Sequence, residues 1–167
     1  MAHIDRRQLL VGAAASLGAA VVPCAPLLAA SRRAHRTLSF YHIHTGKKAR
    51  FTYWEEGQYN LDVLNEVNWF MRDFRNDTIT SMDKHLLDQL TVLNFMAEGR
   101  GHFEIISAYR SPETNDMLRR TTNGVEEDSL HMRGQAMDVR LQGVRLQDLH
   151  NAALKLNSGG VGYYPTS

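Results

Sequence analysis

The chain has 167 residues, 43% of them hydrophobic, which is enough for one domain with a real core. Basic and acidic residues nearly balance, at 19 and 18, so the formal net charge is +1 at pH 7. No basic stripe indicates a nucleic-acid partner, and no lysine-rich amphipathic helix indicates binding to a membrane surface. Any electrostatic recognition must therefore be local.

Residues 1–30 have the composition of an export signal. Arg6 and Arg7 precede an uncharged run rich in Ala, Leu and Val that ends in small residues. The paired arginines favour the twin-arginine route. The alternative is a retained membrane span, but Pro23 and Pro26 leave about 14 uninterrupted apolar residues where a spanning helix needs roughly 20. We expect a periplasmic protein with no stable membrane span after signal removal.

Cys24 is the only cysteine and lies in this leader. A lipid anchor on Cys24 is an alternative, although the preceding Pro23 argues against it. The mature domain is therefore expected to contain no thiol and no disulfide.

A short basic lead-in at residues 31–37 precedes the predicted domain, residues 38–167. Alternating apolar residues predict strands at 38–44 and 49–54, joined as a hairpin by a glycine-containing turn. Apolar residues at three- and four-residue steps then predict amphipathic helices at 60–74 and 83–98. Ser81 or Asp83 is expected to cap the second helix.

The second half of the chain continues this mixture. A strand is predicted at 103–109, and Ser111-Pro112 predicts the start of a helix that runs to about residue 120. Another strand (136–141), a helix (146–156) and an incomplete C-terminal strand from residue 161 follow. The order lacks a strict βαβα alternation, which predicts an α+β fold with a largely antiparallel central sheet flanked by helices.

One segment places His131 and Asp138 seven residues apart, ahead of the apolar strand at 136–141. Imidazole and carboxylate are ligands that suit a borderline metal such as zinc. Gly134 between them lets the backbone fold back so that both side chains can converge. A catalytic zinc usually has three protein ligands, and this motif supplies two.

Ser129, His131, Gly134, Ala136 and Asp138 match the pattern Ser-x-His-x-x-Gly-x-Ala-x-Asp. This pattern resembles the metal-binding signature of the zinc peptidase superfamily of D-Ala-D-Ala carboxypeptidases, phage endolysins and the Hedgehog N-terminal domain. Further blocks resemble, in order, its periplasmic murein endopeptidase branch: residues 38–46, 68–75, 107–111, 129–141 and 159–165. The resemblance implies a peptidase-like fold, Zn²⁺ bound by His131 and Asp138, and cleavage of cross-links between peptidoglycan stem peptides.

The resemblance also assigns Arg110, at the end of the predicted strand. In this family an arginine at this point of Ser-x-Tyr-Arg-Ser orients the substrate and stabilises the developing oxyanion, which suits the fixed donors of a guanidinium. The alternative is a surface salt bridge with Glu113. Ser129 is a candidate for ordering the loop and contacting substrate, and its alternative is an ordinary loop serine.

The third zinc ligand implied by the resemblance is a histidine on a strand after the block at residues 159–165, with the general base close to it. Both are expected beyond Ser167. Without them, the activity of this chain is in question.

Other polar clusters have simpler interpretations. His42 and His44 share one strand face, and a two-histidine metal site there is the alternative to a structural role. The acidic residues 126–128 indicate a solvated loop, with a general base as the alternative. Further histidines have no partner at helical ligand spacing: His85, His102 and His150.

Two functional hypotheses follow. The first is a zinc-dependent peptidoglycan endopeptidase, a metallopeptidase that uses a metal-activated water. The second is a non-catalytic peptidoglycan-binding or regulatory protein whose incomplete metal site still recognises stem peptides.

Overall fold

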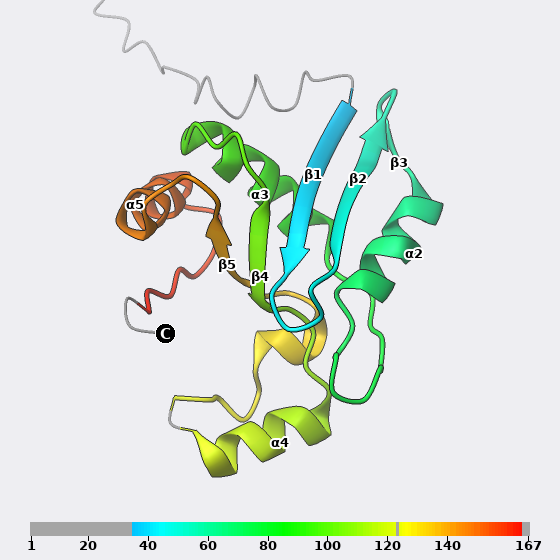
Figure 1. Cartoon of the computed structure of the whole chain (residues 1–167), viewed down its shortest axis with the longest axis vertical. Coiled ribbons are helices and arrows are strands. Elements are labelled where there is room, and N and C mark those ends of the chain that lie inside the picture. The colour runs from blue at the N-terminus through cyan, green and yellow to red at the C-terminus, as the bar shows by residue number, and fades with distance from the viewer. Residues whose placement is uncertain (1–34, 123, 165–167) are drawn as a thin grey trace, which may run out of the picture.

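A computed structural model describes residues 35–122 and 124–164, which contain a five-stranded sheet in the order β3-β2-β1-β4-β5 (Figure 1). The pair β1/β4 is parallel, and the pairs β1/β2, β2/β3 and β4/β5 are antiparallel. The predicted α+β fold with a largely antiparallel sheet is therefore confirmed. The strands are β1 (His35–His42), β2 (Lys48–Glu55), β3 (Gln58–Tyr59), β4 (Phe103–Ser107) and β5 (Asp138–Leu141).

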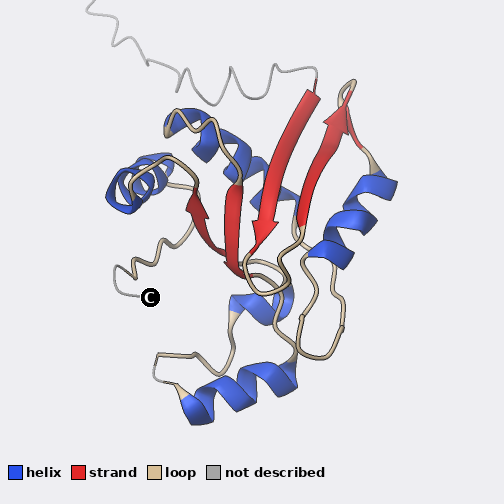
Figure 2. Ribbon diagram, in the orientation of Figure 1, coloured by secondary structure: helices blue, strands red, loops and turns tan. Residues whose placement is uncertain are grey.

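Helices lie beside the sheet and at one end of it (Figure 2). They are α2 (Leu61–Phe70), α3 (Lys84–Met96), α4 (Pro112–Thr121), α5 (Leu146–Leu156) and the short 3-10 helix η1 (Leu130–Arg133). The helix α3 packs against β1 and α5, α2 against β2, and α5 against β5. In contrast, α4 lies beyond the end of the sheet at which β4 finishes. Within the described ranges, no helix is long and apolar enough to cross a membrane.

The core lies between the sheet and these helices. Phe40 on β1 is 1% exposed and packs near the rings of Phe51, Phe70 and Phe103, at centroid distances of 6.2, 6.3 and 6.2 Å. Burying a side chain of this size contributes about 1.5–3 kcal/mol. These contacts hold β1, β2, β4 and α2 together.

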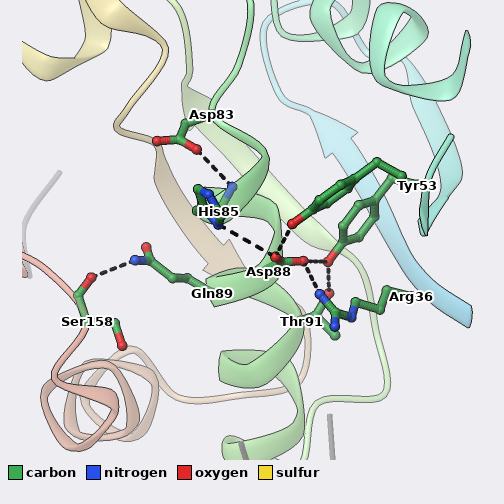
Figure 3. Close-up of polar contacts among 9 residues, drawn as sticks. Arg36, Tyr53, Asp83, His85, Asp88, Gln89, Thr91 and Ser158 are labelled. Carbon is green, nitrogen blue, oxygen red and sulfur yellow. Dashed lines mark hydrogen bonds and ion pairs between the residues drawn. The ribbon is translucent and has the colours of Figure 1, made fainter. Parts of the chain in front are cut away.

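A polar network joins α3 to the three strands β1–β3 (Figure 3). The carboxylate of Asp88 accepts hydrogen bonds from Arg36, Tyr53 and Tyr59, at 2.6, 3.0 and 2.6 Å. Burial raises the pKa of the Tyr53 hydroxyl, and burial together with Asp88 raises that of Tyr59 to about 12. Both tyrosines therefore remain protonated donors near neutral pH, and the network fixes the start of α3 against the sheet.

Several predicted boundaries differ from the structure. β1 begins at His35, so residues 35–37 of the predicted lead-in belong to the strand. The helix predicted for 60–74 ends at Phe70, because a turn follows in which Asp73 donates its N–H to the Thr78 carbonyl and accepts at its own carbonyl from Asp77. The predicted export signal, residues 1–30, lies outside the described residues.

The predicted C-terminal strand is wrong for residues 161–164, which form no regular element. The segment runs along α5 instead of joining the sheet, and Tyr163 stacks on His150 of α5 at a centroid distance of 4.5 Å. Pro165 and the residues after it lie outside the described part of the chain.

Candidate functional site

The predicted site residues meet at the end of the sheet where β4 finishes and β5 begins. In Figure 1 the long loop between α2 and α3, the start of α4 and η1 gather at this end. The local pairing of Ser107 with Asp138 marks the irregular last step of the β4/β5 ladder. The strand ends therefore bring segments that are distant in sequence to one place.

His131 lies on η1 and is 8% exposed. Its Nδ1 is 2.8 Å from the carbonyl oxygen of Ala108, just after β4. Because a carbonyl can only accept, Nδ1 carries the proton in the neutral ring and Nε2 keeps a free lone pair. A backbone carbonyl on the far ring nitrogen is the arrangement usual for metal-binding histidines.

Asp138 opens β5 and faces this imidazole. Its Oδ2 lies 3.5 Å from Nε2 of His131, and the side chain is 37% exposed. The strand begins at Asp138, so the preceding Ala136 lies outside the strand in which sequence analysis placed it. The two predicted metal ligands are thus brought together, with one donor atom of each directed at the other.

Gly134 explains why the segment between them needs a glycine. Its φ of +66° is in the left-handed region, and an added Cβ would lie 2.5 Å from the backbone oxygen of Ser81. The Gly134 carbonyl also accepts from the N–H of Asp83, the residue that caps α3. Any side chain here is therefore excluded by conformation and by space.

Arg110 follows β4, and its side chain contacts the loop before η1. Its Nη1 donates to Oδ1 of Asn115 (3.4 Å) and its Nη2 to Oγ of Ser129 (3.3 Å). Arg110 therefore contacts Asn115 and Ser129, and it does not form the alternative salt bridge with Glu113. Burial lowers the pKa of Arg110 and Arg75 lowers it further, while Asp138 opposes the shift. The guanidinium is thus held close to the Asp138 carboxylate.

Ser129 fixes the start of η1 through its side-chain oxygen. Its Oγ accepts from the N–H of His131 at 3.4 Å, which caps η1, and it also accepts from Arg110. The side chain is 7% exposed. Ser129 therefore connects the predicted catalytic residue Arg110 with the predicted metal ligand His131.

Two buried residues that sequence analysis missed support this arrangement. Asn115 on α4 is 2% exposed and donates from Nδ2 to the carbonyls of Glu126 and Glu127. Asp73 is 1% exposed and accepts from the backbone N–H of Ser111 at 2.9 Å. The available signals were an asparagine inside the predicted helix and an acid within an apparent helical run, but neither signal identifies a contact.

The other histidine and acidic clusters have structural surroundings. The rings of His42 and His44 meet edge-on at 6.0 Å, and His44 stacks on Phe74. In the loop at 126–128, Glu127 pairs with Arg119 and Asp128 with Arg133. Over residues 35–122 and 124–164, no group of three or more His, Cys, Asp or Glu side chains is arranged to hold a metal ion.

Comparison with known proteins gives a consistent result. A family model described as peptidoglycan L,D-endopeptidase MepK matches residues 30–167. Peptidoglycan L,D-endopeptidase MepK of Escherichia coli strain K12 is 38% identical over 163 residues, 98% of this chain and 90% of the relative. Probable peptidoglycan L,D-endopeptidase MepK of Haemophilus influenzae strain Rd is 34% identical over 171 residues, 100% of this chain and 91% of the relative. No solved structure matches significantly.

Proposed function

The chain belongs to the MepK family of peptidoglycan L,D-endopeptidases, and on that premise we propose that it hydrolyses peptide cross-links in peptidoglycan with the help of a bound zinc ion. The stem peptides of peptidoglycan are its proposed partners. The export signal in the sequence of residues 1–30 supports a periplasmic location, where this substrate lies.

The observation that carries the proposal is the pairing of His131 and Asp138. Their donor atoms converge at 3.5 Å, and the Ala108 carbonyl holds the imidazole so that Nε2 presents its lone pair. An imidazole nitrogen and a carboxylate oxygen fit the ligand set of zinc. A zinc ion bound there would polarise the scissile carbonyl and lower the pKa of a bound water.

Arg110 is the proposed catalytic and substrate-binding residue. Two of its nitrogens are oriented by Ser129 and Asn115, while its buried Nε has no hydrogen-bond partner among the described residues. A fixed guanidinium beside Asp138 can donate to the oxygen of a bound peptide as negative charge develops on it. Because Ser129 and Asn115 are neutral acceptors, they orient Arg110 without neutralising it.

Digestion of purified sacculi by the zinc-loaded protein tests this function. We expect release of muropeptides that is lost when a chelator is added and restored by zinc. Unchanged muropeptide profiles with the folded, zinc-loaded chain would contradict it. His85→Ala provides a matched control for His131→Ala, because His85 is exposed on α3 and its contacts are with Asp88 and Asp83, not with His131 or Asp138.

The second hypothesis, a non-catalytic peptidoglycan-binding protein, is favoured by one observation. The described residues bring two candidate ligands together and hold no group of three. This hypothesis predicts that the protein sediments with sacculi while releasing no muropeptides at any zinc concentration. The same digestion experiment therefore separates the two functions.

A further inference from the structure

One buried carboxylate, that of Asp73, joins the backbone at Arg75 to the backbone next to Arg110. Asp73 accepts from the backbone N–H of Arg75 at Oδ1 (3.1 Å) and from that of Ser111 at Oδ2 (2.9 Å). Ser111 directly follows Arg110. The N–H of Tyr109 also donates to the Met71 carbonyl, at 3.2 Å. The loop that carries Arg75 and the segment that carries Arg110 are therefore held at a fixed separation.

Neither arginine makes a close ion pair with another described residue. Among the described residues, no carboxylate lies within ion-pairing distance of Arg75 or Arg110, whereas the neighbouring Arg72 pairs with Asp77 at 2.6 Å. Arg75 is close enough for its charge to contribute, after burial, to lowering the pKa of Arg110. Asp138 partly balances the charge of Arg110, whereas Arg75 has no carboxylate partner among the described residues, so the guanidinium of Arg75 can attract an anion.

Arg75 is also oriented for binding. Its guanidinium carbon lies 4.3 Å above the ring of Phe74, which stacks on His44 at a centroid distance of 4.4 Å. His44 is in turn bonded through Nε2 to the carbonyl of Ile106 on β4. The side chain of Arg75 is exposed, so the edge of its guanidinium can donate two hydrogen bonds to one carboxylate while its face rests on the ring.

We propose that Arg75 and Arg110 form a subsite that binds a free carboxylate of the stem peptide next to the scissile bond. This inference rests on the proposed function, because it takes the peptide as the ligand. Stem peptides carry free carboxylates close to their cross-links, and a guanidinium distinguishes a carboxylate from a neutral amide by both charge and geometry. Arg75 is thereby a specificity-determining residue rather than a catalytic one.

The test compares a cross-linked muropeptide with the same compound after its free carboxylates are converted to primary amides. For the wild type, we expect amidation to raise KM about tenfold or more, because hydrogen bonds to a charged acceptor are lost. Arg75→Gln should raise KM by a similar factor for the carboxylate substrate, with kcat little changed. For the amidated substrate, the variant and the wild type should have the same KM.

Arg72→Gln is the matched control, because Arg72 lies on the same loop and over an aromatic ring, but is paired with Asp77. Its KM values should match the wild type for both substrates. Arg75→Lys keeps the positive charge but cannot donate two parallel hydrogen bonds, so its KM for the carboxylate substrate should lie between those of the wild type and Arg75→Gln.

Equal effects of Arg75→Gln on both substrates, or no effect on either, would overturn the inference. If the wild type cleaves neither compound, the proposed function fails, and equilibrium binding of the two muropeptides still decides whether Arg75 selects the carboxylate.

Discussion

Asp138 presents its Oδ2 atom 3.5 Å from Nε2 of His131, across the end of the sheet where β5 begins. The distance is longer than an ordinary hydrogen bond, and both atoms carry lone pairs when the ring is neutral. The hydrogen bond from His131 to the Ala108 carbonyl and the pairing of Asp138 with Ser107 both fix these residues to the end of β4. This relationship is the basis for the metal-binding proposal.

Arg110→Lys should reduce kcat on a cross-linked muropeptide about 100- to 1,000-fold, which is the effect of removing one oxyanion donor. Lysine keeps the positive charge but cannot donate to Asn115, Ser129 and a substrate oxygen in one plane. Steady-state kinetics measure the effect, with Arg100→Lys as an exposed control. Wild-type kcat in Arg110→Lys would remove Arg110 from the mechanism.

Asn115→Ala should lower both stability and activity. It removes the donor to two carbonyls in the loop before Ser129 and an acceptor of Arg110. Leaving such buried groups unpaired costs about 1–3 kcal/mol of unfolding free energy. Urea unfolding measures the stability, and Asn151→Ala on the exposed face of α5 is the control. If Asn115 orients Arg110, kcat falls as well, at a temperature where the variant is still folded; an unchanged kcat would limit Asn115 to a stabilising role.

Asp73 should make stability depend on pH below its ordinary pKa of 3.8. Burial raises this pKa, but hydrogen bonds from Thr114, Ser111 and Arg75 outweigh burial and lower it overall. A lowered folded-state pKa stabilises the protein above 3.8, and that contribution is lost as pH falls through the folded value. Urea unfolding of the wild type and Asp73→Asn should therefore differ most near neutral pH and converge in acid. A difference that is constant across this range would contradict the assignment.

The lowered pKa of buried His42 should reduce the free energy of unfolding in mildly acidic solution. Burial lowers its pKa from 6.5 to about 4, with smaller contributions from His44 and Arg72. Between these values the unfolded chain binds a proton that the native state does not, so about 3 kcal/mol of unfolding free energy is lost as pH falls from 6.5 to 4. Urea unfolding at several pH values should show a flatter profile for His42→Asn than for the wild type. A slope in His42→Asn equal to that of the wild type would exclude His42 as the cause.

Local sequence signals predicted the elements that depend on local physics. Ser111-Pro112 starts α4 as expected, with the serine Oγ bonded to the N–H of Thr114, and Asp83 caps α3. The pairing of His131 with Asp138 followed from a motif whose glycine has a local conformational reason. Such features depend on a few neighbouring residues, which the sequence displays directly.

Tertiary contacts account for what sequence analysis missed. Phe74 continued the apolar spacing of α2, but its ring stacks on His44 from the β1–β2 turn instead of on a helical face. Asn115 and Asp73 act through backbone groups of distant segments, and no spacing rule identifies backbone partners. The proximity of Arg75 and Arg110, which lie 35 positions apart in the sequence, also depends on backbone contacts of Asp73 that no sequence pattern identifies.

The affinity for zinc of the wild type and of His131→Ala, measured by competition with a chromophoric chelator, tests the central claim most directly. The account predicts that His131→Ala binds zinc at least about tenfold more weakly, because losing a ligand costs no less than losing one of its supporting contacts. His85→Ala should match the wild type. Equal zinc affinities of the wild type and His131→Ala would contradict a metal centre at His131 and Asp138.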